Sequence, residues 1–330
     1  MRRGRWVCLM MVCVCLLVQM GTSAETLVGE NLILEETVGD QTRSRLNYAT
    51  YFAEAKQWDP STVNALDYGI DAEMEARVTS YGDHSYMWSD GQSELFVTDY
   101  GFAGFYTPRG RTWYEILIWY GGCEALSLGL ADLEFATASE AIQTADGFLT
   151  ALGISGAVCQ TVHAFSSEAA EERLAEMRAE GYDENPQAVN DAYVLSYAVE
   201  IDGLLCDTEY FSMANERIIE GIAIQVVVDA EGVILMNPSG NYYETTGIYP
   251  DAPSTVFSFE EIKQVVAAQF DELILSDPVR ISMIKLQYVL QPIDMQRMVY
   301  IPCWCFAMPI GSSGQYYWYR FNAYTGAEII

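Results

Sequence analysis

The residues of this sequence that could carry chemistry are its histidines, cysteines and acidic pairs. Only two histidines occur: His84 lies in an expected loop and His163 in an expected strand, and neither has a second histidine at metal-ligand spacing. His163 could serve a cysteine nucleophile, but no HExxH, GxSxG or P-loop motif is present. We therefore expect no catalytic residues, no metal ion and no cofactor.

Acidic residues are too common to mark a catalytic site by themselves. The chain has 46 of them, and a glycosidase needs two carboxylates roughly 5–10 Å apart across a cleft, which neighbours such as Glu260 and Glu261 do not establish. Asp83, Asp90 and Glu94 offer oxygen ligands for calcium, but their spacing is not that of an EF-hand loop. An envelope hydrolase using paired carboxylates or a Cys/His pair is the alternative function.

Aromatic residues form the more unusual pattern, in the runs Tyr300–Phe306 and Tyr316–Phe321. If these runs are adjacent strands, alternation places Trp304 and Phe306 on one face, and rings of the second run on both. Cross-strand packing is one interpretation. The other is an aromatic groove for a peptide or glycan, because Tyr and Trp supply contact area at little entropic cost. The candidate binding residues are Trp304, Tyr317, Trp318 and Tyr319.

The first 24 residues have the pattern of a secretory signal peptide. Three arginines stand within the first five positions, an apolar run follows from Trp6 to Met20, and small residues precede a cleavage site after Ala24. The apolar run is shorter than the roughly 20 residues of a membrane-spanning helix. We therefore expect a secreted or extracellular protein, with a membrane-anchored, uncleaved form as the alternative.

The charge of the chain limits its partners. The formal net charge is −29, and removal of the three leader arginines leaves 14 basic residues against 46 acidic ones. Such a surface repels phosphate backbones and anionic lipid heads, so nucleic-acid binding is not expected. An envelope protein, a peptide or a glycan is the expected partner, and a membrane tether would exist only if the signal is not cleaved.

Five cysteines follow the predicted cleavage site, namely Cys123, Cys159, Cys206, Cys303 and Cys305. This odd and sparse set does not predict a disulfide scaffold. Most of the five are expected to be buried thiols that behave as small apolar side chains. A single Cys159–Cys206 bridge is the alternative.

Residues 25–130 are predicted to be a β-rich region. A short helix is expected around Arg43 to Lys56. The segments Glu73–Ser80, Glu94–Tyr100 and Trp113–Tyr120 are rich in alternating, β-branched or aromatic residues. Gly and Asp clusters separate them, as at Asp90-Gly91 and Arg109-Gly110. All three are therefore predicted to be strands.

Residues 131–250 are predicted to form a first helix-plus-sheet module. Thr137–Glu140 has the pattern of a capping box, which predicts a helix beginning there. A strand is expected over Gly156–Phe165, an outer charged helix over Ser167–Glu180, and a hairpin turn at Asp229–Gly232.

Residues 251–330 repeat this plan. A second capping box, Ser258–Glu261, begins a helix with an apolar face, and three strands are expected after it, over Val279–Leu290, Val299–Met308 and Tyr316–Ala323. An amphipathic helix can cover the apolar face of a short antiparallel sheet. The predicted fold class is therefore α+β, with tandem modules of one helix packed on a small antiparallel sheet after a β-rich N-terminal region.

The C-terminal module resembles a known family. The helix start Phe257–Ile262, the strand Ile284–Tyr288, the run Tyr300–Phe306 and the ending Asn322–Ile329 resemble the PepSY-like modules of exported Gram-positive proteins. They are similar to the extracellular YycI/YycH-type regulators of a cell-wall sensor kinase, and to uncharacterised secreted or lipoprotein relatives in clostridia. The resemblance implies a non-enzymatic protein that binds or modulates other proteins at the cell envelope. Those regulators keep a membrane anchor, whereas this chain is predicted to be cleaved.

Overall fold

The computed structural model describes residues 26–28, 30–35, 47–78, 83–119, 128, 131–181, 187–214, 217–250, 252–253, 255–273, 277–293, 297–310 and 316–329. The predicted signal segment and Cys123 lie outside these residues. The chain divides into two compact units, one of residues 1–47, 255–286 and 303–330, the other of residues 48–254 and 287–302. None of the described helices is long and apolar enough to cross a membrane.

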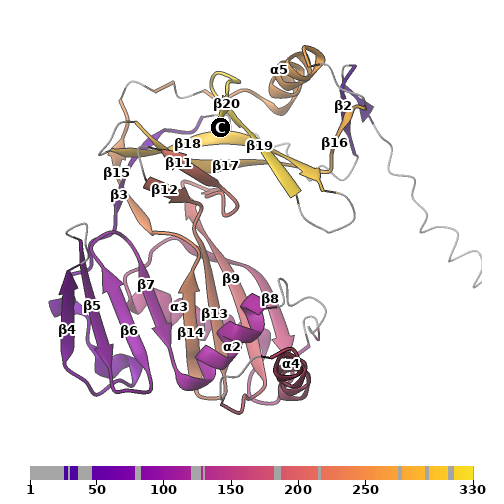
Figure 1. Cartoon of the computed structure of the whole chain (residues 1–330). Helices are drawn as coiled ribbons and strands as arrows, with labels where there is room; N and C mark the ends of the chain where they lie inside the picture. Colours follow the sequence, from indigo (N-terminus) through magenta and orange to yellow (C-terminus); the bar gives the residue numbers. More distant parts are fainter. Residues whose placement is uncertain are drawn as a thin grey trace, which may run out of the picture. The chain divides into compact units, whose positions relative to one another are not determined.

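The second unit is built on a nine-stranded sheet in which every strand pair is antiparallel. The strands follow the spatial order β10-β9-β13-β14-β7-β6-β5-β4, and β8 pairs with β9 (Figure 1). Their bounds are β4 Met74–Val78, β5 His84–Ser89, β6 Glu94–Thr98, β7 Ala103–Tyr106, β8 Ala157–Phe165, β9 Ala192–Ile201, β10 Leu204–Leu205, β13 Ala223–Asp229 and β14 Gly232–Pro238.

Helices cover both faces of this sheet. Figure 1 shows α2 (Pro108–Trp119) and α4 (Ser167–Ala179) on one side and α3 (Ala138–Ala151) on the other. Val194 of β9 belongs to the buried cluster formed with α2 and α4. Tyr197, on the opposite face of the same strand, donates its hydroxyl proton to Asp146 of α3 at 2.9 Å. Because successive side chains of a strand point to opposite faces of the sheet, β9 contributes buried residues beneath the helices on both faces.

The predicted helix starts of the second unit are confirmed. Thr137 accepts a hydrogen bond from the amide of Glu140, whose carboxylate accepts one from the amide of Thr137, which completes the capping box of α3. Ser166 caps α4 through the amide of Ala169. Helix α4 is predicted to lie on the outside of the module. It covers one face of the sheet, and its few apolar residues, including Leu174, are buried there.

The predicted strand Trp113–Tyr120 is wrong, because residues 113–119 belong to helix α2. The aromatic and β-branched composition favours a strand when the segment is considered alone. Trp113, Ile116 and Leu117 are nevertheless spaced for one helical face, and all three are buried in the cluster with α4 and the sheet. Tertiary packing therefore overrides the local preference.

The predicted α+β class with antiparallel sheets is confirmed, but the plan of one helix per small sheet is wrong. Strands from the predicted regions 25–130 and 131–250 join in one nine-stranded sheet that carries three helices. The helix expected around Arg43 to Lys56 is also contradicted in part, because Tyr51–Ala55 form strand β3. β3 pairs with β15 (Tyr243–Ile248) and with the start of β18.

Short elements complete the second unit. The hairpin of β11 (Phe211–Ala214) and β12 (Arg217–Glu220) and two 3₁₀ turns, Pro60–Thr62 and Ala65–Tyr68, belong to it. The strands β17 (Met283–Pro292) and β18 (Met298–Pro309) each contribute residues to both units.

The first unit packs helix α5 (Phe259–Asp271) with β18, β19 (Tyr316–Asn322) and β20 (Glu328–Ile329). The predicted capping box at Ser258 is present. Phe270 of α5 lies with its ring centroid 5.0 Å from that of Tyr319, edge to face. A separate three-stranded sheet consists of β1 (Thr26–Leu27), β2 (Leu32–Leu34) and β16 (Val279–Ile281).

Candidate functional site

The aromatic residues predicted to bind a partner do not all lie on the surface. The register pairs Trp304 with Phe321 and Phe306 with Tyr319, so these rings share one face of β18 and β19. Helix α5 packs on that face. Trp304 is only 2% exposed, and its indole Nε1 donates to the carbonyl oxygen of Phe257 at 3.0 Å. Trp304 therefore packs in the core of the first unit.

The other three predicted residues are more accessible. Tyr317 is 50% exposed and contacts the partly buried Tyr319, with ring centroids 4.8 Å apart. Trp318 points to the opposite face of β19, where the ammonium of Lys285 lies 5.3 Å from its ring centroid. The four residues thus form no single binding surface. A role for any of them in binding stays a prediction.

The surroundings of His84, Cys159 and Cys206 bear on whether these residues could take part in catalysis. His84 Nδ1 lies 3.1 Å from a carboxylate oxygen of Asp99. Cys159 and Cys206 are free thiols, so the alternative of a bridge between them is not realised. Burial and the charge of Asp146 raise the pKa of Cys159 to about 11, which disfavours the thiolate that a nucleophile needs.

The three acids considered as calcium ligands each interact with other groups of the protein. Asp90 accepts hydrogen bonds from the amides of Gln92 and Ser93, and Glu94 pairs with Arg111 at 2.6 Å. No group of three or more metal-ligating side chains occurs among the described residues.

An open cavity of about 500 Å³ lies within the second unit and is a candidate binding site. Its volume is typical of small-ligand pockets, which span roughly 300–1,000 Å³. Residues 52–55 of β3 run along it, and the antiparallel pairing of Ala53 with Met298 brings the start of β18 alongside. Ala53 and Met298 are buried, so they provide a fixed wall for the more exposed polar residues.

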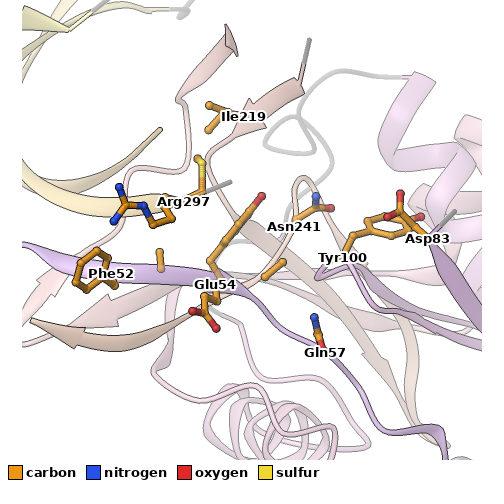
Figure 2. A pocket seen from close by; sticks show the side chains of 12 residues that line it. Phe52, Glu54, Gln57, Asp83, Tyr100, Ile219, Asn241 and Arg297 are labelled. Carbon is orange, nitrogen blue, oxygen red and sulfur yellow. The ribbon is translucent and has the colours of Figure 1, made fainter. Parts of the chain in front are cut away.

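Polar side chains come to this cavity from five places in the chain. Figure 2 shows Arg297 toward one end, Asp83 with Tyr100 at the other, and Asn241 between them, with Glu54 and Gln57 along β3 and just after it. Asn241 is held near Tyr100 because the backbone amide of Tyr242 donates to the carbonyl of Gly101 at 2.6 Å. The cavity is therefore lined by a guanidinium, two carboxylates, two amide side chains and the two phenols of Tyr100 and Tyr243.

The end of the cavity near Tyr100 is electronegative. Partial burial raises the pKa of the Tyr100 phenol, and the negative charges of Asp83 and Asp99 raise it further. Tyr100 consequently keeps its proton at neutral pH and acts as a hydrogen-bond donor or acceptor. A cationic group of a ligand would be favoured at this end.

Sequence reasoning missed this cavity for a physical reason. Glu54, Asp83, Asn241 and Arg297 are far apart in the sequence, and no motif links them. The pairing of β3 with β15 and β18 places Glu54, Asn241 and Arg297 at the cavity, whereas Asp83 comes from just before the start of β5 in the nine-stranded sheet. No local pattern encodes this long-range arrangement. Only a correct prediction of those pairings could have found the site.

Comparisons with known proteins identify the fold but no family. No family model and no curated protein matches this chain. A solved structure of an uncharacterized protein from Eubacterium rectale ATCC 33656 has a TM-score of 0.61 at 14% identity, over 93% of this chain and 92% of that chain. The two proteins share a fold, and at this identity the likeness extends no further.

A second solved structure is the Bacillus megaterium YpeB C-terminal domain. It has a TM-score of 0.31 and 12% identity, over 78% of this chain and 87% of that chain. A likeness at this level carries no argument about fold or role. Membership of the PepSY-like proteins, predicted from the C-terminal module, therefore stays a prediction.

Proposed function

We propose that this chain is an exported, non-enzymatic binding or regulatory protein of the cell envelope, and that it binds a small ligand in the cavity beside β3. The single observation that supports this best is the cavity itself. It is of ligand size, and Arg297, Asp83 and Asn241 all line it although they come from distant parts of the chain. The predicted signal peptide and the resemblance to PepSY-like regulators support export and an envelope role.

The groups around the cavity are suited to holding a ligand. Amide side chains such as Asn241 and Gln57 each offer both donors and acceptors, and Arg297 presents a planar fork of donors to a carboxylate. The Tyr100 phenol stays protonated. This combination supports recognition by hydrogen bonds and charge more than proton transfer.

The hydrolase alternative has less support. Its Cys/His version requires a reactive thiolate, whereas Cys159 has its pKa raised to about 11. At this cavity its carboxylate version would use Glu54 and Asp83, which Figure 2 shows well apart. Hydrolysis of cell-wall fragments by the purified chain, abolished by Glu54→Gln or Asp83→Asn, would establish the alternative.

The proposal is tested by filling the cavity. Ala55 lines it, and Ala76 is an exposed strand residue of β4 outside it. Binding of short peptides and cell-wall glycan fragments would be measured by calorimetry for the wild type, Ala55→Trp and Ala76→Trp. We expect the first substitution to abolish binding and the second to leave it unchanged. Equal behaviour of the two variants toward every ligand would contradict the proposal.

A further inference from the structure

The arrangement of charge in the cavity indicates what kind of ligand it takes. Arg297 lies toward one end and Asp83 lies at the other (Figure 2). Both residues are exposed, and both also interact with other groups of the protein. A ligand that spans the cavity would therefore meet a cationic group at one end and an anionic group at the other.

The middle of the cavity is suited to amide groups. Asn241 and Gln57 both reach it between the charged ends (Figure 2). A carboxamide can donate to a carbonyl oxygen and accept from an N–H at the same time, which is what a peptide group requires. The side chain of Phe52 and the buried Ile219 and Met298 add apolar surface for small side chains.

The net charge of the site excludes simple anions. Arg297 is the single cation among the lining residues, against the carboxylates of Glu54 and Asp83. The chain as a whole carries a formal charge of −29. A ligand with negative charge alone would be repelled by this field, whereas a dipolar ligand gains at both ends.

We propose that the cavity binds a short peptide with free ends, its α-carboxylate on Arg297 and its α-ammonium on Asp83. This inference rests on the proposed function and specifies its ligand. Glu54 also lines the cavity, and its negative charge favours peptides that are neutral or positive overall.

The test uses four forms of tri-alanine: free, N-acetylated, C-amidated and blocked at both ends. Binding to the exported chain is measured by calorimetry for the wild type, Arg297→Gln, Arg297→Lys and Asp83→Asn. Arg77→Gln and Asp71→Asn are the matched controls, because both residues are exposed and neither lines the cavity. Thermal unfolding of each variant confirms that it is folded.

We expect Arg297→Gln to weaken binding of the free peptide about tenfold, as loss of a charge-assisted contact does. The same substitution should leave binding of the amidated peptide unchanged, because that peptide has no α-carboxylate for Arg297 to bind. Arg297→Lys should recover part of the affinity. Asp83→Asn should weaken binding of the free peptide and leave binding of the N-acetylated peptide unchanged. The control variants should bind every peptide as the wild type does.

Two outcomes would overturn the inference. One is equal binding of the free and doubly blocked peptides. The other is an equal effect of Arg297→Gln on free and amidated peptides, which shows no coupling between that side chain and the carboxylate. If no peptide binds while Ala55→Trp abolishes binding of a glycan fragment, the inference fails and the proposed function stands. If Ala55→Trp changes nothing for any ligand, both fail.

Discussion

Gly110, in the first turn of α2, lies directly against the carbonyl oxygen of Ile234 in β14, so closely that no Cβ fits between them. The same carbonyl accepts a hydrogen bond from the amide of Thr107 at 3.0 Å. The hydroxyl of Thr107 in turn accepts one from the amide of Gly110 at 3.0 Å. This contact fixes where α2 begins and how closely it approaches the sheet.

Gly110→Ala should destabilise the protein by about 1–3 kcal/mol, the usual cost of overpacking. The better helix propensity of alanine, worth about 1 kcal/mol, offsets only part of this. The measurement is the free energy of unfolding in urea. Gly147→Ala in α3 is the control, because its Cβ would meet no atom within 4 Å, and it should stabilise by about 0.5–1 kcal/mol. Stabilisation by both substitutions would show that the approach of α2 is looser than described.

The same glycine explains one failure of sequence-based prediction. Arg109-Gly110 was expected to separate two strands, because glycine before an aromatic and β-branched run usually marks a turn. Here glycine is needed for close packing inside a helix, and the sequence gives no sign of that. Capping boxes, in contrast, are local, so Thr137 and Ser258 predicted the starts of α3 and α5 correctly.

Several strands could be predicted from local patterns, but which strands pair with one another could not. The alternation in segments such as Glu94–Tyr100 and the turn at Asp229–Gly232 reflect local burial, and both were confirmed. The pairing of β7 with β14, which unites two predicted regions in one sheet, joins residues about 130 apart. The candidate cavity depends on pairings of this kind, so the sequence singled out only Asp83 among its lining residues, and that as a calcium ligand.

A second prediction concerns the buried carboxylate of Asp229. Its side chain is inaccessible to solvent and lies 3.3 Å from the guanidinium of Arg109, with a further hydrogen bond from Asn190. Arg109→Met should cost about 3 kcal/mol of unfolding free energy, because it leaves a buried charge without its cation. Arg77→Met, in the exposed pair with Glu75, should change stability by less than about 1 kcal/mol. Similar losses for both variants would contradict this assignment.

A third prediction separates packing from binding among the aromatic residues. Trp304→Ala removes a buried indole and its hydrogen bond to Phe257, so it should destabilise by about 3–5 kcal/mol. Tyr317→Ala, at a half-exposed position, should change the unfolding free energy by about 0.5 kcal/mol or less. Denaturant unfolding measures both. A loss of ligand affinity in the folded Tyr317→Ala variant would indicate that the binding site lies at β19.

The capping box of α5 gives a prediction about acid stability. Hydrogen bonds from the amide and hydroxyl of Ser258 lower the pKa of Glu261. A carboxyl group with a lowered folded-state pKa stabilises the fold above the ordinary carboxyl range, and this contribution is lost as the pH falls through the lowered pKa. Glu261→Gln should therefore unfold with a weaker dependence on acid pH than the wild type. Ser258→Ala should cost about 1 kcal/mol at neutral pH.

The last prediction tests the nucleophile alternative directly at Cys159. Burial and the charge of Asp146 raise the pKa of this thiol from 9.0 to about 11, so its thiolate fraction at pH 8 should be roughly a hundredfold lower than for an unperturbed thiol. Alkylation by iodoacetamide, followed by mass spectrometry, should be correspondingly slow in the folded chain and fast in the denatured one. Asp146→Asn removes one cause of the raised pKa and should speed the reaction in the folded state. Fast alkylation of the folded wild type would mean that Cys159 is an activated thiol, and the Cys/His hydrolase would then become the stronger hypothesis.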